Sequence, residues 1–390
     1  MAFQGLDFYG IEELLTEEER LVRDTVRSFV DERVMPDIAK HFKDGTFPRS
    51  MAKEMGELGL LGAHIDGYGC AGLNQVAYGL ICQELERGDS GFRSFASVQG
   101  SLVMFPIWKF GSEEQKQHWL PAMAAGDAIG CFGLTEPDFG SDPGGMITHA
   151  KPTPGGGWIL NGAKMWITNG SIADVAVVWA KTPDGIRGFL VPKGTPGYST
   201  NDIHGKWSLR ASITSELIFD DCKLPGDAIL PESGGLKSPL MCLSSARFGI
   251  SWGALGAAMA CYDEALTHAK TRLVYGKPIG RFQMVQNKLV EMCSRITQGQ
   301  LLAWRLGRLK DENREHFTQI CLAKRNNVAL ALDAARACRD ILGASGITDE
   351  YHCGRHMANL ESVITYEGTH DIHMLIVGAH LTGLNALGND

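Results

Sequence analysis

The spacing of hydrophobic residues changes twice along this chain, and the changes divide it into three zones. From Thr16 to about Gly126, apolar residues recur at the intervals of amphipathic helices. From about Ala128 to Pro239, short β-type runs alternate with turn residues. From about Leu240 the helical spacing returns. The pattern therefore predicts an α+β fold, mainly α, with helices, then a β-domain, then helices.

The first zone also carries local helix signals. Thr16 and Glu19 have the spacing of a capping box, in which each side chain accepts from the other residue's backbone N–H. Further helices are predicted for residues 51–60, 74–87 and 113–123. We expect an N-terminal helical domain over residues 1–127.

The second zone predicts four short strands, at residues 158–160, 175–179, 188–191 and 215–219. Turn signals separate them, at Pro154-Gly155, Asn161-Gly162 and Pro183-Asp184-Gly185. No helical run stands between the strands to provide the crossovers of a parallel sheet. The zone predicts a small antiparallel barrel or sandwich over residues 128–239.

The third zone predicts four long helices, over residues 246–275, 283–310, 317–342 and 370–387. Such helices suit a four-helix bundle over residues 240–390.

The composition narrows the classes of function. The chain has 390 residues and a formal net charge of -8, with 44% hydrophobic and 21% charged residues. These proportions are ordinary for a globular protein with two or three domains. The acidic balance argues against nucleic-acid binding, because neutralising phosphates needs clustered Lys and Arg.

The cysteines and the N-terminal segment bear on the compartment. Ten cysteines occur without a CxxC pair, which is typical of reduced thiols. Met1–Gly10 lacks the basic and apolar regions of a secretory signal. No run of about 18 apolar residues occurs, so no membrane insertion is expected. The expected location is the cytoplasm of a bacterium, or the mitochondrial matrix for a processed eukaryotic chain.

Several familiar motifs fail on their context. Residues 67–72 match the letters of a GxGxxG turn, but residues 62–65 before them make a poor strand, so a plain loop is predicted. No GxSxG occurs, nor a GxxxxGK followed by Ser or Thr, which argues against an esterase elbow and a Walker-type NTPase.

Two histidine pairs stand at helical spacing, His352 with His356 and His370 with His373. Neither pair lies in an HExxH pattern, and no third ligand is evident. No metal site is predicted.

Five segments combine residues that carry chemistry. They are CFGLTEPDFGSD at 131–142, WITN at 166–169, TRLVYGKPIGRFQ at 271–283, DILGASG at 340–346 and TYEGTHD at 365–371. Together they resemble the acyl-CoA dehydrogenase family, and within it the glutaryl-CoA dehydrogenases. The similarity runs from Leu15 to Leu387. It implies the same order of helical domain, β-domain and four-helix bundle, with FAD as cofactor.

The residues themselves support part of this interpretation. Backbone N–H groups around Gly133 and the hydroxyl of Thr135 suit the electron-rich side of a reduced flavin, although a glycine-rich turn would look the same. The indole of Trp166 could cover the isoalloxazine ring of the flavin, although a tryptophan in a strand more often lies in the hydrophobic core. The resemblance assigns contacts with FAD to Phe132, Gly133, Leu134, Thr135, Gly140, Ser141, Trp166, Ile167, Thr168, Arg272, Gln283, Asp340, Ile341, Leu342, Gly343, Ala344, Thr369 and Asp371.

The resemblance implies that the segments at 271–283 and 340–346 reach the FAD of a neighbouring subunit. Arg272 can pair with the pyrophosphate, and the small residues Gly343 and Ala344 allow the ADP portion to approach closely. The family often has two adjacent glycines where this chain has Gly343-Ala344. A cofactor site shared in this way implies an oligomer, and the resemblance implies a homotetramer.

Glu367 is the candidate catalytic base. It stands on a turn before Thr369, a good N-cap for the last helix. A carboxylate there could be an ordinary solvated one, but abstraction of a proton α to a thioester needs a fixed base whose pKa is raised by desolvation. The resemblance places the base at Glu367.

The resemblance also names a substrate. Arg93 matches the arginine that binds the distal carboxylate of glutaryl-CoA, although it could be one more surface cation. The implied reaction is α,β-dehydrogenation with decarboxylation to crotonyl-CoA, in lysine and tryptophan degradation, with electrons passing to an electron-transfer flavoprotein. The expected substrate contacts are Glu86, Arg93, Ser94, Ser97, Ser141, Arg247, Tyr366 and Gly368.

Two alternatives remain open. One is a non-decarboxylating glutaryl-CoA dehydrogenase, or a dehydrogenase or oxidase for another acyl chain. The other is a non-catalytic relative that acts in binding or assembly.

Overall fold

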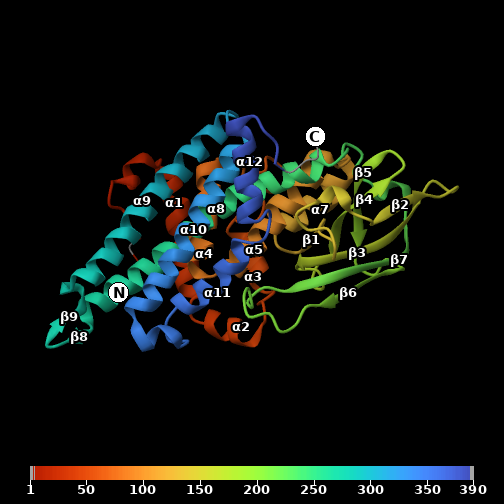
Figure 1. Ribbon diagram of the computed structural model, residues 1–390. Helices are drawn as coiled ribbons and strands as arrows, with labels where there is room; N and C mark the ends of the chain where they lie inside the picture. Colours follow the sequence, from red (N-terminus) through yellow and green to blue (C-terminus); the bar gives the residue numbers. More distant parts are fainter. Residues whose placement is uncertain (1–2, 4, 387–390) are drawn as a thin grey trace.

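The computed structural model describes Phe3 and residues 5–386. Helices from the two ends of the chain pack together, and the sheet of the middle zone lies at one side of them (Figure 1). The predicted fold class is confirmed: the chain is mainly helical, with a central β-domain between two helical parts.

The first helical part forms largely where helix signals are local. Its helices are η1 (Ile11–Leu14), α1 (Glu17–Phe29), η2 (Val30–Val34), α2 (Ile38–Asp44), α3 (Met51–Glu57), α4 (Gln75–Gly88), α5 (Ser90–Ser97), η3 (Val98–Met104), α6 (Phe105–Phe110) and α7 (Glu113–Ala124). The capping box of Thr16 and Glu19 is present. The stretch from α5 to α6 was not predicted, because nearly all its residues are buried and it lacks the polar face that marks an amphipathic helix.

The middle zone forms one mixed sheet with the strand order β1-β4-β2-β3-β7-β6, and β5 pairs with β4. The strands are β1 (Gly130–Gly133), β2 (His149–Pro152), β3 (Trp158–Thr168), β4 (Val175–Thr182), β5 (Gly185–Pro192), β6 (Tyr198–Asp202) and β7 (Thr214–Leu224), with the short helices η4 (Pro143–Gly145) and η5 (Gly226–Ala228). Most pairs are antiparallel, as expected. However, β4 runs parallel to β1 and to β2.

One predicted turn is wrong. Asn161 and Gly162 lie inside β3, and the pairing with β7 shifts register between Leu160 and Gly162. Gly162 has φ of 138°, so the glycine forms a bulge instead of reversing the chain. As a result β3 continues to Trp166 and Thr168.

The C-terminal part contains α8 (Lys237–Thr271), the hairpin of β8 (Leu273–Val274) and β9 (Lys277–Pro278), η6 (Ile279–Arg281), α9 (Gln283–Asp311), α10 (Phe317–Ile341), η7 (Gly343–Ile347), α11 (Cys353–Val363) and α12 (His370–Thr382). α8 begins earlier than predicted, since Pro239 is tolerated in a first turn whose N–H groups have no helical partner. α12 ends at Thr382 with Gly383 as a left-handed C-cap. The predicted end, Leu387, lies outside the described residues.

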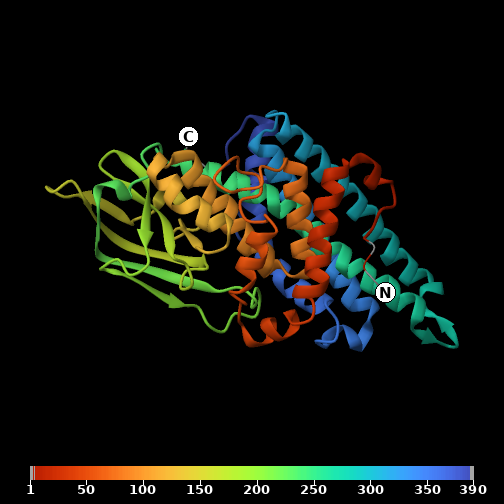
Figure 2. The ribbon, with the colours of Figure 1, turned by 180° about the vertical axis from the view of Figure 1, so that it is seen from behind.

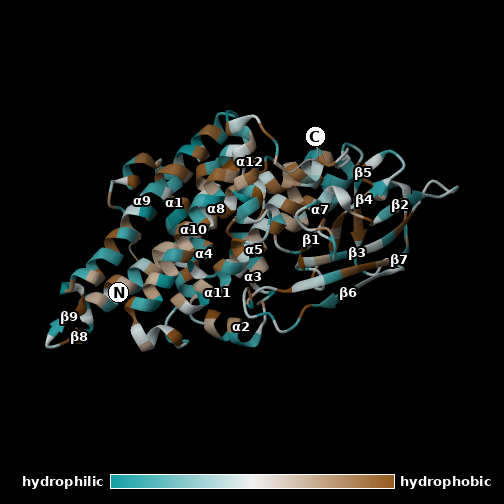
Figure 3. Ribbon diagram, in the orientation of Figure 1, coloured by the Kyte–Doolittle hydropathy of each residue, from teal (hydrophilic) through white to brown (hydrophobic). Residues whose placement is uncertain are grey.

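The helices of both ends share one hydrophobic core, in which α8 packs against α4 and α10. Figure 2 shows the N-terminal helices beside the C-terminal ones from behind, and Figure 3 shows hydrophobic positions alternating with hydrophilic ones along them. A second core joins α6 and α7 to one face of β4 through Val175, Val177 and Trp179. A third forms between the strands on the other face. This packing brings α4, α5, α8 and α10 around the loop before α12.

Candidate active site

The loop between α11 and α12 holds Glu367 in an uncommon backbone conformation. Glu367 has φ of 53° and Gly368 has φ of 92°, both in the left-handed region that side chains disfavour. Thr369 caps α12, accepting from the N–H of Ile372 at 3.1 Å, as predicted. The turn fixes the direction in which the Glu367 side chain leaves the backbone.

Two buried cations hold this loop by its backbone. Lys324 on α10 is 1% exposed, and its Nζ donates to the carbonyl oxygen of Tyr366 and, at 2.7 Å, to that of Gly368. Arg247 on α8 donates from Nε to the carbonyl oxygen of Glu367 at 2.6 Å. Three consecutive carbonyls therefore each accept from a cation. The expected contact of Arg247 with the CoA arm stays a prediction.

The Glu367 carboxyl is in a water-poor environment. Its Oε2 is buried and has no hydrogen-bond partner within the described residues. Burial raises the pKa of Glu367, while the charges of Arg93, Lys324 and Arg247 oppose the rise. A base with a raised pKa is suited to removing a weakly acidic carbon-bound proton.

Arg93 lies fully inside the protein, so its interpretation as a surface cation is wrong. Its side chain is 0% exposed, and its Nε donates to Glu86 Oε2 at 2.7 Å. One terminal nitrogen donates to the hydroxyl of Tyr366. The other, Nη1, has no partner among the residues described. The guanidinium thus has one donor group free beside the base loop.

The helices around Arg93 are locked by close packing and capping. A Cβ on Gly253 of α8 would stand 2.0 Å from Glu86 Oε2, so only glycine lets α8 pass this close. Asp89 caps α5 by accepting from the N–H of Gly91 at 2.7 Å. Asp89 is itself held by Arg355 at 2.7 Å and Asn359 at 2.8 Å. These contacts fix the position of the Arg93 side chain.

Further predicted substrate contacts gather at the same place. The hydroxyl oxygens of Ser94 and Tyr366 are 3.4 Å apart. Ser97 is buried, and its Oγ has no partner in the described part of the chain. The structure therefore brings Glu86, Arg93, Ser94, Tyr366 and Glu367 together.

The two predicted flavin segments of the β-domain adjoin each other. The N–H of Met165 donates to the carbonyl oxygen of Thr135 at 2.8 Å, joining the end of β1 to β3. Trp166 has φ of 63° and stands where the pairing of β3 with β7 shifts register. The bulge turns its indole outward, and the residue is 61% exposed. An exposed indole face fits stacking against a planar ring.

The remaining residues of the predicted flavin set differ in exposure. Phe132, Gly133, Leu134 and Ile167 are buried, and Thr135 and Thr168 are half-buried. Gly140, Ser141 and Asp371 are exposed.

The other two cofactor segments lie far from the base loop of their own chain. Arg272 follows α8, which is continuous from Lys237 to Thr271. At a rise of 1.5 Å per residue, Arg272 is about 37 Å along the axis from Arg247. The β8–β9 hairpin beside it and the main sheet stand at opposite ends in both Figure 1 and Figure 2.

These distant segments are largely exposed. Arg272, Gln283, Asp340, Gly343 and Ala344 lie at the surface, whereas the side chains of Ile341 and Leu342 lie in the core. Gly343 has φ of 62° and no atom within 4 Å of an added Cβ, so the turn needs glycine for its conformation while the space beside it is open.

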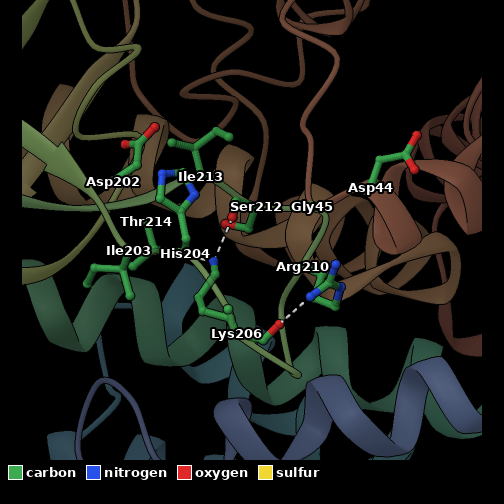
Figure 4. Close-up of a pocket in the computed structure, with 11 residues that line it drawn as sticks. Asp44, Gly45, Asp202, Ile203, His204, Lys206, Arg210, Ser212, Ile213 and Thr214 are labelled. Atoms are coloured by element: carbon green, nitrogen blue, oxygen red, sulfur yellow. Dashed lines mark hydrogen bonds between the residues drawn. The ribbon is translucent and has the colours of Figure 1, made fainter.

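A small polar pocket lies between the end of α2 and the β6–β7 connection (Figure 4). Lys206 donates there to the carbonyl oxygens of Leu209 at 3.0 Å and Ser212 at 2.7 Å, and to the Thr214 hydroxyl at 2.6 Å. These bonds use all its donors, and burial lowers the pKa of Lys206 to about 8. None of the predicted site residues lines this pocket.

Neither histidine pair belongs to the group that the structure offers to a metal. Within the described part of the chain, that group is Glu264, Cys338 and Cys353. Glu264 accepts from the N–H groups of His352 at 2.9 Å and Cys353 at 3.0 Å, so it caps α11. The segment at 67–72 forms a loop with left-handed glycines, not the start of a helix after a strand.

No helix of the described residues combines the length and apolar character needed to cross a membrane.

Comparison with protein-family models gives three matches in chain order. They are the N-terminal, middle and C-terminal domains of acyl-CoA dehydrogenases, at residues 16–127, 131–222 and 233–382. The human mitochondrial short-chain specific acyl-CoA dehydrogenase is 38% identical over 374 residues, which are 94% of this chain and 90% of that protein.

Two solved structures share the whole fold. Glutaryl-CoA dehydrogenase from Mycobacterium smegmatis, in complex with FADH2, is 56% identical with a TM-score of 0.97, covering 98% of this chain and 99% of that one. Butyryl-CoA dehydrogenase from Megasphaera elsdenii is 32% identical with a TM-score of 0.90, covering 94% of this chain and 98% of that one.

Proposed function

The chain belongs to the acyl-CoA dehydrogenase family, and from this premise we propose that it oxidises glutaryl-CoA to crotonyl-CoA and CO2. Membership itself gives the coarser chemistry. Family members are FAD-dependent oxidoreductases that act on a CH–CH bond, so FAD is the cofactor.

The residues present fit this cofactor. Trp166 offers an exposed indole face, and Thr135 and Thr168 offer hydroxyls on the adjoining strand ends. When bound, FAD accepts the hydride that leaves the β-carbon of the acyl group. Arg272, with Gln283 and the turn at Gly343, would hold the pyrophosphate and ADP portion of a neighbouring subunit's FAD.

The observation that carries the choice of substrate is the charge balance beside the base. Arg93, Lys324 and Arg247 surround two carboxylates, Glu86 and Glu367. With all five ionised, one positive charge remains, and Arg93 Nη1 has no partner among the described residues. A buried surplus charge is costly, so an acyl chain that ends in a carboxylate fits better than a plain alkyl chain.

The chain's own groups then perform defined steps. Arg93 seats the distal carboxylate of the substrate, with Ser94, Ser97 and Tyr366 as further donors. The backbone N–H of Glu367 polarises the thioester carbonyl. The Glu367 carboxylate takes the proton from the α-carbon as the β-hydride leaves. The bond between the γ-carbon and the distal carboxylate then breaks, CO2 departs, and protonation at the γ-carbon gives crotonyl-CoA.

The proposal includes partners and a location. Electrons leave to an electron-transfer flavoprotein, and the chain works as a homotetramer, as the family resemblance implies. Arg272 and the sheet lie at opposite ends of one subunit, which supports a cofactor site shared between subunits. The exposed apolar residues of the β8–β9 hairpin support contact with another copy, with Leu273 at 58% and Tyr275 at 92% exposure. The working compartment is the bacterial cytoplasm or the mitochondrial matrix, in the degradation of lysine and tryptophan.

One experiment tests the function directly. Glutaryl-CoA is added anaerobically to the purified flavoprotein, the flavin absorbance is followed, and the acyl-CoA products are identified by mass spectrometry. Bleaching with crotonyl-CoA as product supports the proposal. Bleaching with glutaconyl-CoA as product would identify a non-decarboxylating enzyme.

A second candidate is a short-chain acyl-CoA dehydrogenase. The 38% identity to the human short-chain enzyme favours it, but the unpartnered donor of Arg93 opposes it. Faster bleaching by butyryl-CoA than by glutaryl-CoA would make this the better assignment.

A further inference from the structure

Two lysines of this chain lie fully inside it, and they are neutralised differently. Lys164 is 0% exposed and pairs directly with Glu136 at 2.8 Å. Lys324 is 1% exposed but donates to two backbone carbonyls, those of Tyr366 and Gly368. Burying an ammonium group is costly without a compensating charge. For Lys324 the strongest favourable charge is that of Glu367.

Lys324 therefore contacts the loop at the residues on either side of the base. Its two acceptors flank Glu367, whose own carbonyl is taken by Arg247 at 2.6 Å. The titratable and charged groups that face Lys324 are Tyr366 and Glu367 on the loop, Arg93 on α5, Arg247 on α8, Cys321 on α10, and His370 and His373 on α12.

We propose that Lys324 is a positioning residue for the base: it holds the left-handed turn on both sides of Glu367 and keeps a positive charge beside the carboxylate. This rests on the proposed function, in which Glu367 removes the α-proton. Hydrogen bonds from a charged donor are stronger than neutral ones, so the two bonds offset the unfavourable backbone conformation at Glu367.

The charge has a consequence for pH dependence. Burial raises the pKa of Glu367, and Lys324 is among the cations that oppose the rise. Burial lowers the pKa of Lys324 in turn, and the charge of Glu367 opposes that fall, so each ionised group favours the other. Removing the ammonium charge therefore raises the Glu367 pKa further. Because only the ionised carboxylate accepts a proton, the acidic limb of the kcat/KM profile moves to higher pH.

The test compares Lys324→Met, Lys324→Gln and Lys324→Arg in the flavin-containing protein. The first readout is amide hydrogen exchange of the peptide that contains residues 365–370, which needs no substrate. The second readout is the pH profile of kcat/KM, measured with the acyl-CoA that bleaches the wild-type flavin fastest. In Lys324→Met, exchange becomes at least roughly tenfold faster, because two charged hydrogen bonds are lost. The acidic limb moves up by about one pH unit or more.

The other two variants separate hydrogen bonding from charge. Lys324→Gln keeps N–H donors without the charge, so exchange falls between wild type and Lys324→Met, while the acidic limb stays displaced. Lys324→Arg keeps the charge and returns the limb toward wild type. The control Lys53→Met removes an exposed cation paired with Asp127 and leaves both readouts unchanged.

The outcomes decide separately on the inference and on the function. Wild-type exchange and a wild-type acidic limb in Lys324→Met would overturn the inference, as would faster exchange without any displacement of the limb, which describes a purely structural lysine. If Lys324→Met does not fold, the same comparison is made between the Gln and Arg variants. If no acyl-CoA bleaches the wild type, the proposed function fails, and the exchange data still report whether Lys324 holds the loop.

Discussion

The base loop and the cofactor-binding arm at the far end of α8 are built in opposite ways. Around Glu367 one chain supplies the whole environment: Arg93, Lys324 and Arg247 are buried, and each donates to a neighbour within the same subunit. Around Arg272 the predicted ligand groups are exposed and stand beside a projecting hairpin. The contacts that hold the first region come from one subunit, whereas the second region is exposed and, under the proposal, is completed by another subunit.

The two regions are built for two different tasks, the reaction chemistry and the binding of the cofactor. Reaction chemistry needs charges fixed in low dielectric before the substrate arrives, which a folded core provides. Binding a large cofactor across subunits needs open donors that become buried only on assembly. Substitutions in the first region should therefore affect rate and specificity, and those in the second should affect cofactor retention.

The largest expected effect belongs to Glu367→Gln. The amide has nearly the same shape but cannot accept the α-proton, so the rate of flavin bleaching falls by about 100-fold to 10,000-fold. The measurement is anaerobic stopped-flow absorbance with glutaryl-CoA. FAD content should be unchanged, because the amide keeps the size of the side chain and the Glu367 side chain is not among the predicted FAD contacts. A variant that bleaches at the wild-type rate would remove Glu367 from the role of base.

The next effect is that of Arg93→Ala on substrate choice. Loss of a desolvated pair with the distal carboxylate removes about 2–5 kcal/mol of interaction free energy. The kcat/KM for glutaryl-CoA therefore falls roughly 30-fold to several thousand-fold. Butyryl-CoA, which has no distal carboxylate, serves as the matched control and loses much less. Equal losses on both substrates contradict the assignment.

Arg93→Ala also leaves Glu86 as an unpaired buried carboxylate, which is destabilising in itself. The double substitution Glu86→Gln with Arg93→Gln removes both charges and keeps a polar side chain at each position. If the single variant fails to fold, the ratio of the two substrates is measured in the double variant.

The sequence predicts those features of the fold that depend on local signals. Caps such as Thr16 and Thr369 marked helix starts correctly, since a cap is satisfied by N–H groups two or three residues away. The three zones followed from spacing alone. The stretch from α5 to α6 was missed because it is buried on nearly all sides.

The burial of the groups around Glu367 could not be predicted from local sequence signals. The burial of Arg93 depends on Gly253 and Glu86, which meet it only after α8 packs on α4. Lys324 was not singled out at all. It does lie on the buried face of α10 with Ile320 and Ala323, so a lysine interrupting an apolar stripe was the available signal.

In the cofactor arm, Arg272→Ala should weaken the binding of FAD. The loss of a charged hydrogen bond to pyrophosphate costs about 1.5–3 kcal/mol, or roughly 10-fold to 150-fold in Kd. The nearby exposed Arg281→Ala is the control and should leave Kd unchanged. The measurement is the fluorescence of flavin released during dilution. Equal weakening in both variants would mean a general charge effect instead of a specific contact.

The same experiment sharpens the difference between the two regions. If Arg272 reaches the FAD of another subunit, dissociating the oligomer by dilution should release flavin from the wild type as well. The hydrogen exchange of the Glu367 loop should respond much less, because its contacts all come from one chain.

The smallest effect expected is that of Gly343→Ala. Among the described residues an added Cβ meets no atom within 4 Å, so the cost within one subunit is the left-handed φ of 62°, which an L-residue adopts at about 1 kcal/mol. In a chain of this length that corresponds to a Tm lower by about 1–2 °C, measured by calorimetry. Gly155→Ala is the control, since that glycine also has open space but no left-handed φ, and its Tm should not fall. A loss of several kcal/mol in Gly343→Ala would mean that the turn is packed in the assembled protein in a way that one subunit does not show. A small loss of stability with a clear loss of FAD would instead indicate that the ADP portion of FAD occupies the open space beside Gly343, and that this turn serves cofactor binding.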